Sequence, residues 1–310
     1  MKVKYRWSFL FFSFLLFSSF SYGQMLSNEF GQAFSIHPFF DSIFIHRNKI
    51  QAIQGHYVYY QLGHSPVDTK DFKRFEFNKK GQLVRRIETQ AFLGKPDTIV
   101  FVYHYDSSGR CNMFGRYDPY GAYAYTFKFD ENGRKIKKAF YQKSKIKFGK
   151  NNPFTIDKLE KIYEEKSSYE NLLGPNGVQE KETIYNQSNV PYKVIFYYLD
   201  NENRVIRKRE KLIRTLEQKV SEISYNNEGF IDTVKVKSNF QDQQNKMIVF
   251  GYDEKNVLKK FEYQNGKYLY QTQVVYDRNK WFIKDILRQT VATNFMEILE
   301  IDTYQHFGEN

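Results

Sequence analysis

The chain has 310 residues with a formal net charge of +12, and 41% of its residues are hydrophobic and 18% aromatic. Cys111 is its single cysteine, which excludes an intramolecular disulfide and leaves burial and strand pairing to stabilise the fold. The richness in Phe and Tyr favours strands over helices, and the positive charge is compatible with anionic partners.

Residues 1–23 have the pattern of a secretory signal peptide. Cationic residues are followed by an uncharged run from Ser8 to Phe20 and then by small residues up to Gly23. The run is shorter than the roughly 20 residues that a membrane-spanning helix needs. We expect cleavage, a mature chain without a transmembrane helix, and a location in the periplasm, at the cell surface or in the medium. Because no cysteine follows the apolar run, a lipoprotein is not expected.

Residues 24–71 are predicted to form N-terminal strands that lead into a longer meander. Lys49–Ile53 and Tyr57–Tyr60 read as strands because apolar and polar residues mix at short spacing. The segment also contains four histidines, whose spacing matches no metal-ligand motif and which are therefore predicted to be structural or surface residues: His37, His46, His56 and His64.

Residues 72–289 contain a repeated turn motif, an aromatic residue followed by Asp or Asn and, three residues later, usually by Gly or Asn. Such a turn is expected because Asp or Asn bonds the backbone two residues on, and Gly or Asn accepts a positive φ. The motif begins at Phe77, Tyr105, Phe129, Tyr185, Leu199, Tyr225, Tyr252 and Tyr276. The spacing of two strands and two turns per copy predicts repeated antiparallel hairpins.

The positions directly before each turn predict a one-sided sheet. The first and third residues before the Asp or Asn are aromatic or apolar in most copies, as in Phe75 and Phe77 or Tyr103 and Tyr105, whereas Glu76 and His104 lie between them. Since side chains alternate along a strand, one face is aromatic and the other largely wet.

Two copies resemble the YD repeat of RHS proteins: Phe101-Val-Tyr-His-Tyr-Asp-Ser-Ser-Gly-Arg110 and Tyr125-Thr-Phe-Lys-Phe-Asp-Glu-Asn-Gly-Arg134. RHS proteins use such hairpins to build a large β-shell around a toxin or an extracellular binding surface. The resemblance implies an envelope or interaction role and no catalytic residue. The chain is too short for a closed shell of that kind, residues 141–184 break the period, and residues 290–310 are expected to form a C-terminal cap.

These patterns predict an all-β fold: an antiparallel meander of repeated β-hairpins, curled into an open sheet or a partial barrel, with few or no helices after the signal peptide. The aromatic face needs a cover, which we expect from curling of the sheet or from the segment 141–184.

Basic clusters recur after the turns and are the one candidate ligand surface in the sequence: Arg85, Arg86, Arg134, Lys135, Lys137, Lys138, Arg207, Lys208, Arg209, Lys259 and Lys260. If these residues line up as one stripe, they would bind an anionic envelope glycan, a lipid headgroup or another envelope protein. No specific nucleic acid is expected as a partner. The alternative is a solvated face whose charges discourage edge-to-edge association.

No catalytic, cofactor or metal site is predicted. Each turn supplies one carboxylate, fewer than a calcium loop offers, and a nucleophilic pair of Cys111 with His104 lacks any family signature. We expect a non-catalytic exported envelope or secreted protein that acts as a binding or scaffold module. The sequence does not predict its oligomeric state. Two alternatives are an outer-membrane β-barrel, since alternating strands of this length also build those proteins, and an envelope glycan hydrolase.

Overall fold

The computed structural model describes residues 25–28, 31–92, 95–149, 152–172, 178–240, 244–253, 256–277 and 282–309. The expected signal peptide, 1–23, lies outside the described residues. Within these ranges the helices are short, α2 (Ser42–Arg47) and the 3₁₀ helix η2 (Ile156–Lys158). The strands are β1 (Ile50–Gln61), β2 (Val67–Phe77), β3 (Leu83–Phe92), β4 (Lys95–Tyr105), β5 (Cys111–Asp118), β6 (Gly121–Phe129), β7 (Lys135–Ser144), β8 (Glu160–Asn171), β9 (Val178–Tyr185), β10 (Pro191–Leu199), β11 (Val205–Leu212), β12 (Gln218–Tyr225), β13 (Ile231–Ser238), β14 (Lys246–Asp253), β15 (Asn256–Gln264), β16 (Lys267–Asp277), β17 (Phe282–Thr290) and β18 (Phe295–His306).

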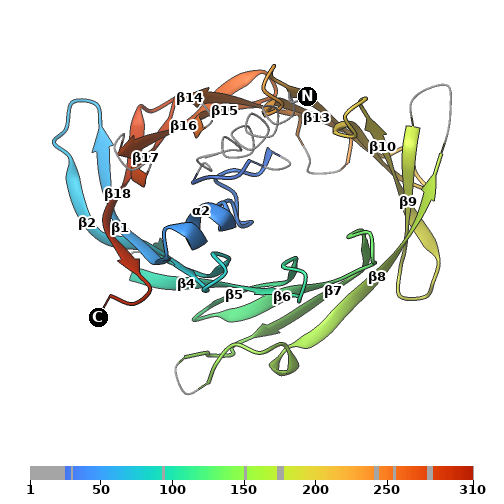
Figure 1. Cartoon of the computed structure of the whole chain (residues 1–310), viewed down its shortest axis with the longest axis horizontal. Coiled ribbons are helices and arrows are strands. Elements are labelled where there is room, and N and C mark those ends of the chain that lie inside the picture. The colour runs from blue at the N-terminus through green and yellow to red at the C-terminus, as the bar shows by residue number, and fades with distance from the viewer. Residues whose placement is uncertain are drawn as a thin grey trace, which may run out of the picture.

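The strands form one closed antiparallel barrel. Each strand pairs with the next in the chain, and β18 returns to pair with β1 from Ile50↔His306 to Gln61↔Phe295. The all-β meander with almost no helices is confirmed, but the expected curled open sheet or partial barrel is wrong, because 18 strands close on themselves (Figure 1). Closure satisfies the backbone groups that an edge strand would expose. The expected cap, residues 290–310, contains the strand that makes this closure.

The turn motif behaves as the sequence predicts. The Asn78 side chain accepts a hydrogen bond from the N–H two residues on, that of Lys80, at 2.9 Å. The Asp106 side chain also accepts one from the Arg110 N–H at 3.0 Å, and the Gly109 N–H donates to the Asp106 carbonyl at 3.0 Å. The fourth turn position has a positive φ at Gly81, Gly109, Gly133, Asn189, Asn203 and Gly229. The arginine after the turn adds an ion pair to its own turn, as in Arg110 with Asp106 at 2.8 Å.

Alternation of strand direction divides the connections between two ends of the barrel. One end, the motif end, carries the turns after β2, β4, β6, β10 and β12, and the other, the open rim, carries the connections after β1, β3, β5, β7 and β11. The turn after Tyr185 joins β9 to β10 and therefore falls on the open rim. The segment 141–184 breaks the period because it supplies β8 and β9. The next motif turn, after Tyr185, therefore follows an odd-numbered strand, whereas the turns before it follow even-numbered strands.

The N-terminal residues 25–28 and 31–49, here called the plug, lie inside the ring of strands, with α2 in the bore (Figure 1). Its Phe40 ring lies 4.9 Å from the Phe75 ring and 5.1 Å from the Phe77 ring of β2. Across the bore, Asn28 donates a hydrogen bond to the Tyr252 hydroxyl of β14 at 2.9 Å. The plug thus covers the aromatic face of the sheet, which is the lumenal face.

The segment after β7 covers the outer wall instead of the aromatic face. The Phe154 ring stacks on the Tyr117 ring of β5 at 5.7 Å, and Leu159 is buried with Ala122 and Ala124 of β6. The sequence predicts one of two covers for the aromatic face: the sheet does curl on itself, as the pairing of β1 with β18 shows, whereas the described residues that follow β7 do not pack against that face. The plug already occupies that side.

At five places a tyrosine near the motif end of a strand bonds a carbonyl of the preceding hairpin. The Tyr105 hydroxyl donates to the Leu83 carbonyl at 2.8 Å, and the Tyr276 hydroxyl donates to the Val257 carbonyl at 2.9 Å. The same bond recurs at three further places, from Tyr225 to Val205, from Tyr252 to Ile231 and from Tyr304 to Ile283. These bonds form a tyrosine ladder, which satisfies hydroxyls that would otherwise be buried without partners.

Candidate ligand site in the barrel lumen

The barrel divides the candidate basic surface between two environments. In each adjacent pair one residue faces the lumen and its neighbour faces outward, because side chains alternate along a strand. The lumenal residues are Arg86, Lys135, Lys138, Lys208 and Lys260, and the outward ones are Arg85, Lys137, Arg207, Arg209 and Lys259. Arg134 belongs to its turn and bonds Asp130 at 2.7 Å. The residues therefore do not form a single stripe.

Most of the lumenal cations are paired with a glutamate. Arg86 lies 3.5 Å from Glu88, Lys138 lies 3.5 Å from Glu165, Lys208 lies 3.2 Å from Glu210 and Lys260 lies 3.1 Å from Glu262. In three of the four cases the glutamate is two residues further along the same strand and so shares the lumenal face. A cation followed two residues later by a glutamate is visible in the sequence and indicates an ion pair on one face of the strand, which the basic clusters alone do not indicate.

A cavity in the bore beside the plug is here called the chamber. Its volume is about 660 Å³, and strands from both sides of the barrel seam, β1–β3 and β15–β18, line it together with the plug. Phe34, Ser35 and Phe39 of the plug lie on one side, while Tyr59 and Glu297 lie near the strand ends that reach the open rim. The His46 ring of the plug bonds the Lys79 carbonyl in the motif-end turn after β2, so the plug lies on the motif-end side of the chamber.

Three ion pairs line the chamber. Lys73 lies 3.1 Å from Glu88, Lys260 lies 3.1 Å from Glu262, and Arg288 lies 3.5 Å from Glu297. The side chains of Lys260 and Glu88 are largely buried, at 10% and 19% exposed. The lining charges balance, and each pair offers both donors and acceptors to a bound molecule.

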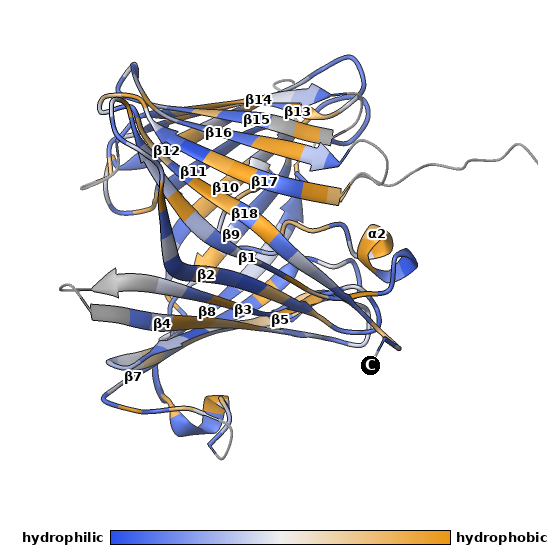
Figure 2. Cartoon of the chain, turned by 90° about the vertical axis from the view of Figure 1, so that its left-hand side faces the viewer, coloured by the Kyte–Doolittle hydropathy of each residue, from blue (hydrophilic) through white to orange (hydrophobic). Residues whose placement is uncertain are grey.

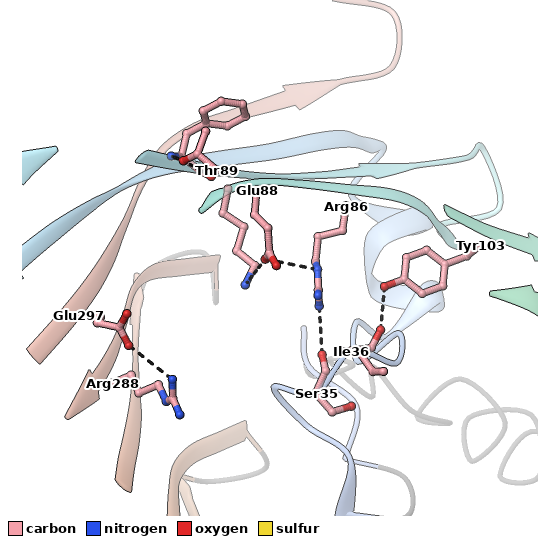
Figure 3. A network of polar contacts seen from close by, with 10 residues as sticks. Ser35, Ile36, Arg86, Glu88, Thr89, Tyr103, Arg288 and Glu297 are labelled. Atoms are coloured by element: carbon pink, nitrogen blue, oxygen red, sulfur yellow. Dashed lines mark hydrogen bonds and ion pairs between the residues drawn. The ribbon is translucent and has the colours of Figure 1, made fainter. Parts of the chain in front are cut away.

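Glu88 holds the centre of a network that joins the chamber to the plug (Figure 3). Arg86 packs over the Phe101 ring at 3.9 Å and donates to the Ser35 carbonyl at 3.2 Å. Burial alone would raise the pKa of Glu88, but Lys73 and then Arg86 outweigh burial, and the pKa falls below its usual value. Glu88 is therefore ionised at neutral pH.

Aromatic rings complete the lining. The Tyr57 and Tyr59 rings stack with centroids 6.2 Å apart, and Phe295 lies 5.7 Å from Tyr59. The Tyr59 hydroxyl donates to Asp71 at 3.2 Å. Burial, and then the Asp71 carboxylate, raise the pKa of Tyr59 to about 12, so the hydroxyl remains a donor at neutral pH.

The far wall of the lumen carries a second polar network on β8–β10. Glu182 is buried and accepts hydrogen bonds from Ser167 and from the Tyr197 hydroxyl, both at 2.7 Å. The Tyr192 hydroxyl donates to Glu165. Burial and the Glu182 carboxylate raise the pKa of Tyr197. The lumen is thus lined by tyrosine hydroxyls and charge pairs on both sides.

The structure separates the residues that suggested metal or nucleophile chemistry. His37 lies in the lumen beside Phe114, His46 bonds the Lys79 carbonyl, and His56 bonds Asp302. Within the described residues no group of three or more His, Cys, Asp or Glu side chains is placed to hold a metal.

Cys111 and His104 lie on opposite faces of the sheet. Cys111 packs against the lumenal core, whereas His104 pairs with Met113 on the outer face. Burial raises the pKa of Cys111 to about 11, which disfavours the reactive thiolate.

The outer wall carries charge along its strands. Lys128 of β6, Lys137 of β7 and Lys166 of β8 stand directly opposite one another, and Figure 2 shows hydrophilic residues interrupting the hydrophobic ones along the strands. Some outward cations are paired, as Arg85 with Glu76 at 3.4 Å and Lys137 with Glu164 at 2.7 Å. In the described part of the chain no helix has the length and apolar character of a membrane span.

These features define the chain as a closed 18-stranded antiparallel β-barrel with an internal N-terminal plug. No family model matches the sequence, and no curated protein matches it. Among solved structures, it is similar to a porin-like protein from Bacteroides uniformis, with 9% identity and a TM-score of 0.36, covering 82% of this chain and 98% of that one. A DUF1329 family protein from Desulfovibrio piger has 8% identity and a TM-score of 0.19, covering 87% and 92%. The complex TcdB2-TccC3 has 11% identity and a TM-score of 0.16, covering 74% and 20%. At these scores the similarities carry no functional argument.

Proposed function

We propose that the chain is an exported, non-catalytic binding protein of the cell envelope that holds a small polar ligand in its plugged lumen. The observation that supports this proposal is the chamber of about 660 Å³, within the ~300–1,000 Å³ typical of small-molecule sites. Because the plug lies on the motif-end side of the chamber, we infer that the chamber retains a ligand and does not act as an open pore.

The lining favours a neutral or zwitterionic ligand with many hydroxyls, and we propose a saccharide. Lys73, Lys260 and Arg288 balance Glu88, Glu262 and Glu297, so the chamber does not select a strongly charged molecule. Charge pairs supply both donors and acceptors to hydroxyl groups, and the Tyr57, Tyr59 and Phe39 rings offer apolar faces to the C–H face of a sugar ring.

Two further parts of this proposal come from the sequence. Export is inferred from the leader at residues 1–23, and the likeness of the turns to the YD repeat of RHS proteins stays a prediction. Among the described residues the chamber carboxylates are paired with cations, which leaves the hydrolase alternative without a supporting observation.

The test compares two neighbouring lysines that face opposite ways. Lys260→Met removes a chamber cation and Lys259→Met removes its outward neighbour. With a panel of neutral oligosaccharides in calorimetry, we expect one class to bind the wild type and the Lys259→Met variant equally. Binding to Lys260→Met should be weaker by about tenfold or more, since a charge-assisted hydrogen bond is lost. Equal affinity of the two variants, or no saccharide binding to the wild type, contradicts the proposal.

A second candidate function is an outer-membrane β-barrel. Closure of 18 antiparallel strands of 8 to 12 residues favours it, as do the short turns at one end of the barrel. Against it stands the outward charge of Lys166 in the middle of β8, because a lysine facing lipid costs about 2–4 kcal/mol at the bilayer midplane. Lys128 and Lys137 lie near strand ends, where this cost falls to about 0–1 kcal/mol.

Purification without detergent separates the two candidates. A mature chain that stays monodisperse in aqueous buffer supports the aqueous binding protein. A chain that aggregates unless detergent is present, and then migrates as a folded barrel, supports the membrane-spanning alternative.

A further inference from the structure

The open rim is more apolar than the motif end. Five described apolar or aromatic side chains are at least 59% exposed, namely Leu216 (88%), Leu62 (68%), Ile43, Val67 and Tyr120 (59% each). Four of the five lie on connections of the open rim, on three different loops. The motif-end turns, by contrast, carry Asn, Asp, Ser, Lys and Glu at their tips.

Turn geometry does not require an apolar side chain at these loop positions. Leu62 and Val67 flank the β1–β2 connection, and Leu216 projects from the β11–β12 connection beside Ile213, which is 43% exposed. Exposed apolar groups raise the free energy of the barrel in water, and four of the five most exposed ones share one end of it, although they lie on separate loops.

Cations accompany the apolar tips. Arg214 lies two residues from Leu216, and Lys145 donates its backbone N–H to the Tyr120 carbonyl at 2.7 Å, so its loop lies beside the Tyr120 tip. Lys267 projects from the β15–β16 turn and is exposed. Two nearby carboxylates are engaged locally, Asp118 with Arg116 at 3.1 Å and Glu217 with the Thr215 hydroxyl at 3.1 Å. Asp68, beside Val67, is 77% exposed and lies 3.5 Å from His56.

From this arrangement we propose that the open rim docks onto the surface of an anionic lipid bilayer. Isolated apolar tips on separate loops suit a fluid surface, which accommodates each tip independently, better than a single rigid protein patch. Apolar insertion and attraction of Lys and Arg to anionic headgroups are the two terms of interfacial binding. Docking in this orientation turns the mouth of the chamber toward the membrane.

Vesicle co-sedimentation without detergent tests the proposal. The probes are vesicles of phosphatidylcholine alone and of phosphatidylcholine with phosphatidylglycerol. We expect binding to the anionic vesicles, weaker binding to the neutral ones, and release at high salt, because exposed charges are screened. Failure to bind either vesicle overturns the proposal, and so does binding that resists a high-salt wash, since that indicates a spanning barrel.

Two double variants locate the contact. Leu62→Ser/Leu216→Ser removes two rim tips and should weaken vesicle binding by about tenfold or more. The control Ile43→Ser/Ile206→Ser changes two exposed isoleucines away from the rim and should bind as the wild type does. Equal binding by both variants, or an equal loss in both, contradicts the proposal. Should the rim variant fail to fold, Arg214→Gln/Lys267→Gln replaces it, with a reduced preference for anionic vesicles as the expected result.

Discussion

Adjacent residues on one strand of this barrel have different roles, which is clearest at Arg85 and Arg86. The Arg86 side chain is 6% exposed; it forms an ion pair with Glu88, donates a hydrogen bond to the Ser35 carbonyl and packs over the Phe101 ring. The Arg85 side chain is 46% exposed and forms an ion pair with Glu76. The sequence placed both in one basic cluster. It could not separate them, because the face that is lumenal depends on strand closure and not on residue type.

Arg86→Gln should destabilise the protein by about 2–4 kcal/mol, because a buried carboxylate loses a partner and the plug loses an anchor. Arg85→Gln should change the free energy of unfolding by no more than about 0.5 kcal/mol. Urea denaturation of both variants measures the difference. Equal effects would show that the two side chains do not face different environments.

Glu88 predicts a pH dependence of stability. Its pKa in the folded chain lies below the ordinary 4.5, because Lys73 and Arg86 outweigh burial. The stabilisation is therefore complete above pH 4.5 and is lost as the pH falls through the lowered pKa. In denaturation curves recorded below pH 4.5, the wild type should lose stability more steeply than Glu88→Gln. Parallel pH profiles for the two proteins would contradict this assignment.

At the scale of elements, the sequence predicts the hairpins well because their turns are determined locally. Asp106 and Gly109 fix their turn through contacts within five residues, and the alternation of Phe75, Glu76 and Phe77 fixes which side chains share a face. The tyrosine ladder was not predicted, since Tyr276 and its acceptor Val257 are joined only when neighbouring hairpins pack side by side.

Tyr276→Phe tests the ladder. It leaves the carbonyl of the buried residue Val257 without its donor and should cost about 1–2 kcal/mol. Tyr198→Phe, on the outer face, is the matched control and should have an effect near zero. A thermal denaturation series in which both variants match the wild type would rule out a stabilising role for the ladder.

At the scale of the molecule, the position of the plug could not be read from the sequence. Phe39, Phe40 and Phe44 precede the first strand and carry no turn motif, so nothing local shows that they enter the bore. Closure also depends on contacts between residues about 250 positions apart, such as His306 with the Asn48 carbonyl at 2.9 Å. A pattern of period two describes an open sheet and a closed barrel equally well.

Gly55 marks the seam between β1 and β18. A Cβ atom there would come within 2.1 Å of the Glu300 carbonyl oxygen on β18, which no side chain can tolerate without moving the backbone. Gly55→Ala should therefore destabilise the protein by about 2 kcal/mol or more, through strain at the seam. A variant as stable as the wild type in chemical denaturation would mean that β18 does not approach β1 in this way.

The chamber exists only if β18 returns to pair with β1, and a disulfide across this seam tests the pairing most directly. Val58 and Ile298 are paired residues on β1 and β18. In a Cys111→Ser background, Val58→Cys/Ile298→Cys should form an intramolecular disulfide on mild oxidation, seen as one linked peptide by mass spectrometry. The control Val58→Cys/Val220→Cys, with its second cysteine on β12, should not form one. A disulfide in the seam variant alone is the result we predict; its absence, or equal linkage in the control, would contradict a closed barrel.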